Sequence, residues 1–129
     1  MTTAALYRWQ TIHRWSSGTV ALVALVHCAM TAVIYDVWDT NALWFLGFGL
    51  ALLLLAAMNL AHVGFGRHEP CEQPTAPILR WFNWIFAAFG IAALVAVSEP
   101  QAIVIVAGLA GQAVASVWTL RGPTRVVAA

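Results

Sequence analysis

The chain has 129 residues, of which 62% are hydrophobic and only 9% charged, and its mean hydropathy is +0.82. Soluble domains are far less apolar, so this composition excludes a soluble globular protein. The six basic side chains are spread along the chain and leave a net charge of only +1, which excludes a nucleic-acid-binding face.

The first half of the chain predicts an interfacial helix followed by two membrane spans. Residues 1–16 mix aromatic and cationic side chains, a pattern typical of a short helix lying at the cytoplasmic surface of a membrane. Apolar segments follow at about residues 17–35 and 42–63. Each is long enough to cross the hydrocarbon layer, which takes about 20 residues of helix. Asp39, in the short turn between them, offers an oxygen that caps the second span.

The second half predicts a polar loop and two more spans. Residues 64–77 contain three of the five prolines, which disfavour a helix there. The third apolar segment covers about residues 78–97 and the fourth about 101–119, with a short turn between them. Because short turns make consecutive helices antiparallel neighbours, we expect an all-α integral membrane fold, a single membrane domain arranged as a four-transmembrane-helix up-down bundle.

The arginines predict the orientation of this bundle. They occur only near the two termini and around the 64–77 loop, and the other two connections carry only acids. Arginine accumulates on the cytoplasmic side of membranes. The sequence therefore predicts a multi-pass protein of the bacterial inner (plasma) membrane with both termini and the 64–77 loop in the cytoplasm. The arginines are Arg8, Arg14, Arg67, Arg80, Arg121 and Arg125.

Small residues recur at helical spacing in the later spans and predict close helix–helix contact. The fourth span carries Ala107, Gly111 and Ala115 on one face and Gly108 beside it, and the second carries Gly47. Such stripes let helix backbones approach closely in lipid. The pattern leaves open whether the contact is made within one chain, in a homo-oligomer or in a larger membrane complex.

Polar side chains inside the spans are the candidate ligand-binding residues, because leaving them in lipid is costly. Counting about 1.5 Å per residue from the midpoint of each span places His27 and Gln112 near the membrane centre. Asn59 and Asn83 fall about 8–11 Å toward the cytoplasm, and His13 and His62 about 15–20 Å toward it. For His27, the structural alternative is a hydrogen bond to Gln112, Thr31 or a backbone carbonyl. The candidates are His27, Thr31, Asn59, His62, Asn83 and Gln112.

Haem and metal sites are further alternatives. Two axial histidines must flank one iron at about 2 Å each, and only His13 and His62 match in depth. In the loop, His68 and Cys71 could bind a metal together with His62 or His13. Their spacing matches no paired-ligand zinc pattern, so a solvated loop is the favoured interpretation and no cofactor is predicted.

Three function classes follow. The first is a non-enzymatic accessory or interaction subunit that packs through its small-residue helix faces. The second is a bundle that binds or passes a small hydrophobic molecule or a proton through a mid-membrane layer of His27 and Gln112. The third is a redox carrier with b-type haem or metal. No serine or cysteine can be placed beside both a histidine and an acid, so no catalytic residue is predicted.

Overall fold

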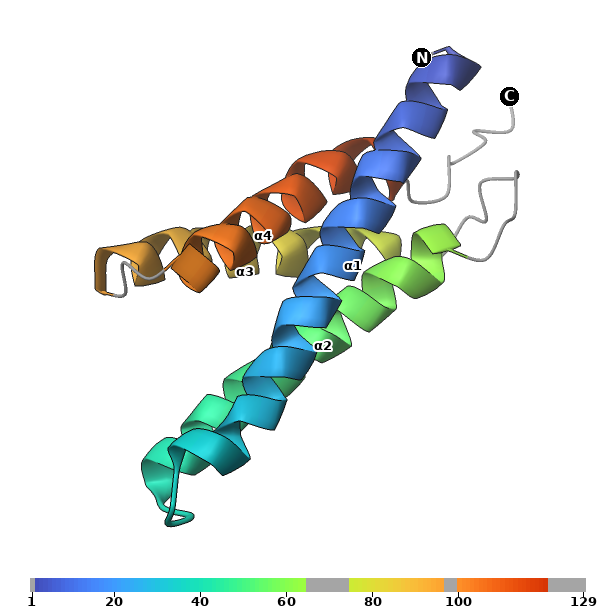
Figure 1. Cartoon of the computed structure of the whole chain (residues 1–129). Coiled ribbons are helices and arrows are strands. Elements are labelled where there is room, and N and C mark those ends of the chain that lie inside the picture. Colours follow the sequence, from blue (N-terminus) through green and yellow to red (C-terminus); the bar gives the residue numbers. More distant parts are fainter. Residues whose placement is uncertain (1, 65–74, 97–99, 121–129) are drawn as a thin grey trace.

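The computed structural model describes residues 2–64, 75–96 and 100–120, and these residues form four helices (Figure 1). Helix α1 covers Thr3–Ile34, α2 Thr40–Gly64, α3 Ala76–Ala96 and α4 Pro100–Thr119. All four are long and apolar enough to cross a membrane. The all-helical fold and the four candidate membrane helices are therefore confirmed, and they indicate a multi-pass membrane protein.

Helix α1 differs from the prediction, because the interfacial segment and the first span form one continuous helix. The helix begins after Thr2, whose side chain accepts a hydrogen bond from the backbone N–H of Ala5 (3.3 Å). Ser17, the residue at which the first span was predicted to begin, instead lies buried within the helix and accepts a hydrogen bond from Gln112 of α4. With 32 residues the helix is about 48 Å long, so it is longer than the hydrocarbon layer is thick.

The other helix starts lie within two residues of the predicted spans. Asp39 caps α2 as predicted, since its Oδ1 accepts a hydrogen bond from the backbone N–H of Ala42 (2.9 Å). Helix α3 begins at Ala76 rather than 78, with Pro77 in its first turn. Proline is tolerated there because the first N–H groups of a helix have no partner within it.

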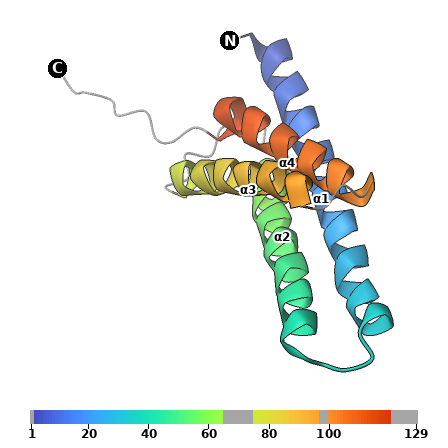
Figure 2. The same ribbon diagram turned by 90° about the vertical axis from the view of Figure 1, so that its left-hand side faces the viewer.

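The four helices form two antiparallel hairpins that cross steeply. Helix α1 packs along α2, and α3 packs along α4. The hairpins meet mainly where α4 crosses α1, whereas α2 and α3 share few contacts. In Figure 2, α3 and α4 run across α1 and α2 rather than beside them. The end of α1 and start of α2 therefore lie well apart from the end of α3 and start of α4 (Figures 1 and 2).

Glycines on α4 allow this crossing. A Cβ added at Gly108 would lie 2.8 Å from Cγ2 of Val20, and one added at Gly111 would overlap the side chain of Ser16. Side chains larger than hydrogen therefore do not fit between α4 and α1 at these points. The small-residue face of α4 therefore packs against α1 of the same chain rather than against another copy or another protein. Gly47 is different, because a Cβ there would meet nothing within 4 Å.

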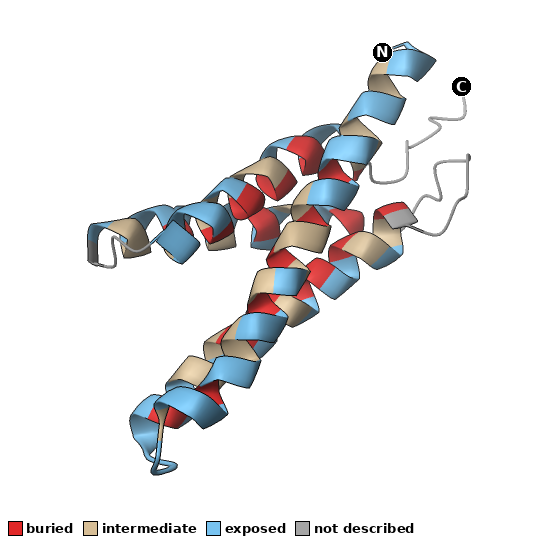
Figure 3. Cartoon of the chain, in the orientation of Figure 1, coloured by how far each residue is buried: buried red, intermediate tan, exposed pale blue. Residues whose placement is uncertain are grey.

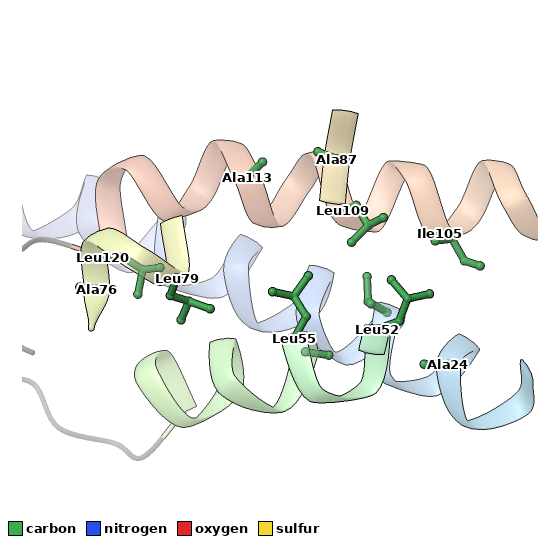
Figure 4. Close-up of a cluster of buried hydrophobic side chains, with 12 residues drawn as sticks. Ala24, Leu52, Leu55, Ala76, Leu79, Ala87, Ile105, Leu109, Ala113 and Leu120 are labelled. Carbon is green, nitrogen blue, oxygen red and sulfur yellow. The ribbon is translucent and has the colours of Figure 1, made fainter. Parts of the chain in front are cut away.

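The core lies where the hairpins cross. Buried residues concentrate at the crossing, and the far ends of the hairpins are mostly exposed (Figure 3). Leu52, Leu79 and Leu109 are the largest fully buried apolar side chains of this core. In the close-up, Leu52 of α2 lies near Leu109 of α4, and Leu79 of α3 lies near Leu120 (Figure 4). Among the described residues, seven buried side chains are polar, and His13, Ser17, Asn59, Asn83 and Gln112 of this set lie at the junction between the hairpins.

Candidate functional site

One hydrogen-bonded network joins all four helices at the crossing. His13 of α1 contacts Thr119 of α4 through Nδ1 (2.6 Å) and Asn59 of α2 through Nε2 (2.7 Å). Asn59 in turn pairs with Asn83 of α3. His13, Asn59 and Asn83 are completely buried. We call His13, Asn59, Asn83 and Thr119 the four-helix network.

The two asparagines form a reciprocal amide pair. Asn59 Nδ2 donates to Asn83 Oδ1, and Asn83 Nδ2 donates to Asn59 Oδ1, both at 2.8 Å. The remaining N–H of Asn59 donates to the carbonyl oxygen of Leu55 (2.9 Å). Asn59 Oδ1 thus has two partners, Asn83 and His13, which uses both of its lone pairs. Satisfied polar networks of this kind hold helices in one register.

The network fixes which nitrogen of His13 carries a proton. Asn59 Oδ1 can only accept, so His13 Nε2 must be the donor of that bond. In a singly protonated ring, Nδ1 then accepts from the Thr119 hydroxyl. That hydroxyl has a second acceptor within reach, the carbonyl oxygen of Ala115 at 3.0 Å. Rotation of one hydroxyl would therefore let His13 hold a second proton without losing either neighbour.

A second polar contact lies beside the network, between α1 and α4. Gln112 Nε2 donates to Ser17 Oγ (3.0 Å), and both side chains are completely buried. Gln112 Oε1 is buried and has no hydrogen-bond partner among the described residues. Ser116, one turn further along α4, donates to the carbonyl oxygen of Ala113 (2.7 Å). Gln112 thus links α4 to α1 where the two hairpins cross.

The predicted layer of His27 and Gln112 does not form. Ser17, the partner of Gln112, precedes His27 by ten residues on α1, which is about 15 Å along the helix axis. His27 instead contacts α2: its Nε2 lies 3.1 Å from the carbonyl oxygen of Phe45, and its ring stacks on that side chain at 3.6 Å. Thr31 donates to the carbonyl oxygen of His27 (3.4 Å). Of the structural partners predicted for the His27 ring, the backbone carbonyl is found, whereas Thr31 bonds the backbone of His27 instead.

The depth counts assumed upright helices with a common midpoint, an assumption that does not hold for helices that cross steeply. His13 was placed nearer the cytoplasm than Asn59, yet the two are hydrogen-bonded. The first span was counted from residue 17, whereas α1 begins at Thr3. Thr119 was not predicted as a site residue at all. The signal that could have found it is its position in the last turn of α4, where polar side chains commonly bond backbone carbonyls.

The hydrogen bonds of the two depth-matched histidines bear on the haem alternative. Both ring nitrogens of His13 are bound within the four-helix network. His62 Nδ1 lies 3.0 Å from the carbonyl oxygen of Met58, and its Nε2 lies 3.1 Å from Thr75 Oγ1, just before α3. Axial ligation would therefore break a short buried hydrogen bond of His13.

The metal candidates give no cluster in the part of the chain that can be described. Across residues 2–64, 75–96 and 100–120, no three His, Cys, Asp or Glu side chains gather where they could hold a metal ion. Two of the predicted ligands, His68 and Cys71, lie outside these residues. His13 and His62 therefore remain the only predicted metal ligands with described positions, and each is hydrogen-bonded to helix or network atoms.

Two arginines bind the carboxyl ends of neighbouring helices, a role that the sequence reasoning missed. Arg14 of α1 donates through Nε (3.0 Å) and Nη2 (2.8 Å) to the carbonyl oxygen of Val63 at the end of α2. Arg80 of α3 donates through Nη2 to the carbonyl oxygen of Leu120 just after α4 (2.9 Å). The last carbonyls of a helix lack partners within it and attract cations. Each hairpin thus has an arginine on its first helix that caps its second.

In comparisons with known proteins, no family model, curated protein or solved structure matches the chain.

Proposed function

We propose that this chain is a non-enzymatic accessory or interaction subunit of the bacterial inner membrane, bound to a second copy or to another membrane protein. The observation that supports it is the large apolar surface left uncovered. In the most apolar stretch of each helix, only 22–33% of the residues are buried within the chain. The small-residue face of α4 is already occupied by α1, so the partner surface must lie elsewhere.

Helix α3 is the best candidate for that surface. It packs along α4 and makes few contacts with α2, apart from the ring contact between Phe48 and Phe89 (5.9 Å). Phe82, Ile85 and Phe89 are 46–58% exposed and recur at spacings of three and four residues, so they share one face. Aromatic side chains contribute large contact areas at protein interfaces. A partner helix lying on this face would complete the packing that α2 does not supply.

The proposed topology is up-down-up-down with both termini in the cytoplasm. Helices α3 and α4, with 21 and 20 residues, are about 30 Å long and must stand nearly upright to span the membrane. Helices α1 and α2 are longer, with 32 and 25 residues, so their hairpin can tilt and still span. Tilt of the longer hairpin thus accommodates part of the steep crossing.

Labelling and fusion experiments test the topology. A cysteine at Thr40 should react with an impermeant thiol reagent added outside the cell, and a reporter fused after Ala129 should be active only as a cytoplasmic fusion. A cysteine at Pro74 is the matched position on the opposite side and should be protected. Labelling of Pro74→Cys instead of Thr40→Cys would reverse the proposed orientation.

Site-specific photo-crosslinking tests the partner surface. A photoreactive phenylalanine at Phe82 or Phe89 should join the chain to a polypeptide in intact membranes. The same group at Leu22, which is 63% exposed on α1, serves as the control and should give lipid adducts only. Equal yields of polypeptide adducts at all three positions, or none at any, would contradict the assignment to α3.

A second candidate function is the binding or passage of a proton. The four-helix network is a better site for that proton than the predicted layer of His27 and Gln112. His13 has a donor site and an acceptor site already bound, and the Thr119 hydroxyl has an alternative acceptor in Ala115. Proton uptake would therefore need one hydroxyl rotation. Proton flux into vesicles containing the purified protein should be lost in His13→Gln and Thr119→Val and kept in His27→Leu. Equal flux in all variants and in empty vesicles would exclude this function.

A further inference from the structure

A pocket at the arginine-bearing end of the second hairpin has no role in the proposed interaction. It has a volume of about 400 Å³ and lies between the first turns of α3 and the last turns of α4. Its wall consists of Pro77, Arg80, Trp81, Trp84 and Val117. Arg80 is therefore the only charged side chain among the described residues that line it.

Arg80 has a buried donor without a partner. Its Nη2 donates to the carbonyl oxygen of Leu120, but Nε is buried and has no hydrogen-bond partner among the described residues. Arg14 makes the equivalent cap on the first hairpin, and there both Nε and Nη2 bind the same carbonyl oxygen. A guanidinium stays charged in proteins, and leaving one of its buried donors unsatisfied is costly. The Arg80 guanidinium, which lines the pocket, thus has hydrogen-bonding capacity left for a further acceptor oxygen, and an anionic acceptor fits best.

The two tryptophans place this pocket at the depth of lipid headgroups. Trp81 is 71% exposed and Trp84 45% exposed, and both lie in the first three turns of α3. Tryptophan collects at membrane interfaces because its ring is apolar and its N–H is polar. Further along the same face of α3, Ile91 and Val95 are 57% and 90% exposed. Exposed apolar side chains thus continue along this face of α3 from the pocket toward the other end of the helix.

We propose that this pocket binds the phosphate of an anionic phospholipid through Arg80, with the acyl chains lying along Trp84, Ile91 and Val95. A volume of about 400 Å³ is at the small end of the range of ligand pockets. It accommodates a phosphate and glycerol, while the chains remain outside on the helix face. Because the described residues of the lining bring one positive charge and no acid, a headgroup with net negative charge is favoured over a zwitterionic one. The site requires that α3 spans a membrane but does not depend on a protein partner.

Native mass spectrometry of the purified full chain tests the site. The protein is placed in nanodiscs that contain equal amounts of phosphatidylglycerol and phosphatidylcholine, and the lipids retained after release are counted. The wild type should retain one phosphatidylglycerol. Arg80→Gln should lower this selectivity at least about tenfold, since a charge-assisted hydrogen bond contributes that much or more. Arg14→Gln is the matched control and should keep it, because Arg14 caps a helix in the same way but lies outside the pocket.

A second variant separates loss of the site from loss of the fold. Val117→Phe adds a ring to the pocket wall and leaves the bond from Arg80 to Leu120 in place, and it should also abolish the retained phosphatidylglycerol. Retention in Val117→Phe at the wild-type level would overturn the site.

The wild type alone decides between lipid and free phosphate. If it retains both lipids equally, the proposal fails whatever the variants do. If inorganic phosphate binds in the absence of lipid and displaces phosphatidylglycerol, the occupant is free phosphate and the lipid assignment is wrong. Selective retention of phosphatidylglycerol that excess inorganic phosphate does not displace would support the lipid.

Discussion

Replacing Asn83 with leucine should destabilise the junction of the hairpins more than its two hydrogen bonds alone suggest. The change removes the 2.8 Å bonds to and from Asn59, and hydrogen bonds between membrane helices average about 0.6 kcal/mol each. It also leaves one N–H of the completely buried Asn59 without a partner, which adds to the cost. We therefore expect the free energy of unfolding to fall by about 1–3 kcal/mol.

The double variant makes this prediction sharper. In Asn59→Leu, the side chains of His13 and Asn83 lose their shared partner. Replacing Asn83 as well then removes a group that is already unpaired, so the second change should cost little. The double variant should be more stable than the sum of the single changes predicts, by about 1 kcal/mol.

Unfolding by a denaturing detergent in mixed micelles, followed by tryptophan fluorescence, measures these differences. Asn41→Leu is the matched control, because Asn41 is exposed and makes only a 3.4 Å contact with Asp39 at the start of α2. Its effect should stay within about 0.5 kcal/mol. If Asn83→Leu costs no more than the control, or if the two buried asparagines contribute additively, the pair is not coupled and the reasoning is refuted.

Three further predictions concern other contacts. Gly108→Ala places a Cβ 2.8 Å from Val20 Cγ2 and should cost about 1–3 kcal/mol of stability in the same assay; Gly47→Ala, which meets nothing within 4 Å, should instead be neutral or stabilising, and equal effects would contradict the close crossing. His27→Leu removes the 3.1 Å contact with the carbonyl oxygen of Phe45 and the stacking on the Phe45 ring, but an apolar side chain still packs there. The variant should therefore insert and assemble normally, which membrane fractionation and size-exclusion chromatography check; failure to accumulate would show a larger structural role. Asp39→Ala removes the cap of α2 and should cost about 1 kcal/mol, with no loss of stability if that bond does not form in the membrane.

The helices could be predicted from the sequence because apolar length and helix-breaking residues are local signals. Asp39 and Pro77 mark helix starts through the chemistry of the first turn, which depends on no distant residue. The break expected near Ser17 was wrong for the opposite reason. A buried serine that bonds Gln112 across the hairpins looks, in the sequence alone, like an N-cap.

The candidate site could be predicted only in part, because depth along a helix was used in place of the crossing geometry. Asn59 and Asn83 were placed in one layer, and the structure pairs them. His27 and Gln112 were placed in another and are separated. The difference lies in the glycines of α4, which bring that helix across α1 at an angle that spacing within one helix does not encode.

The four-helix network also sets an order for the maturation of the chain. Its members are separated by as many as 106 residues, and Thr119, the last of them, is the final residue of the last helix. During synthesis, His13 and Asn59 can meet once the first hairpin is inserted, but the other ring nitrogen of His13 gains its partner only when α4 has been made. A nascent protein interrupted before Thr119 would carry an unsatisfied histidine between its helices. The junction between the hairpins therefore becomes fully hydrogen-bonded only after α4 has been inserted.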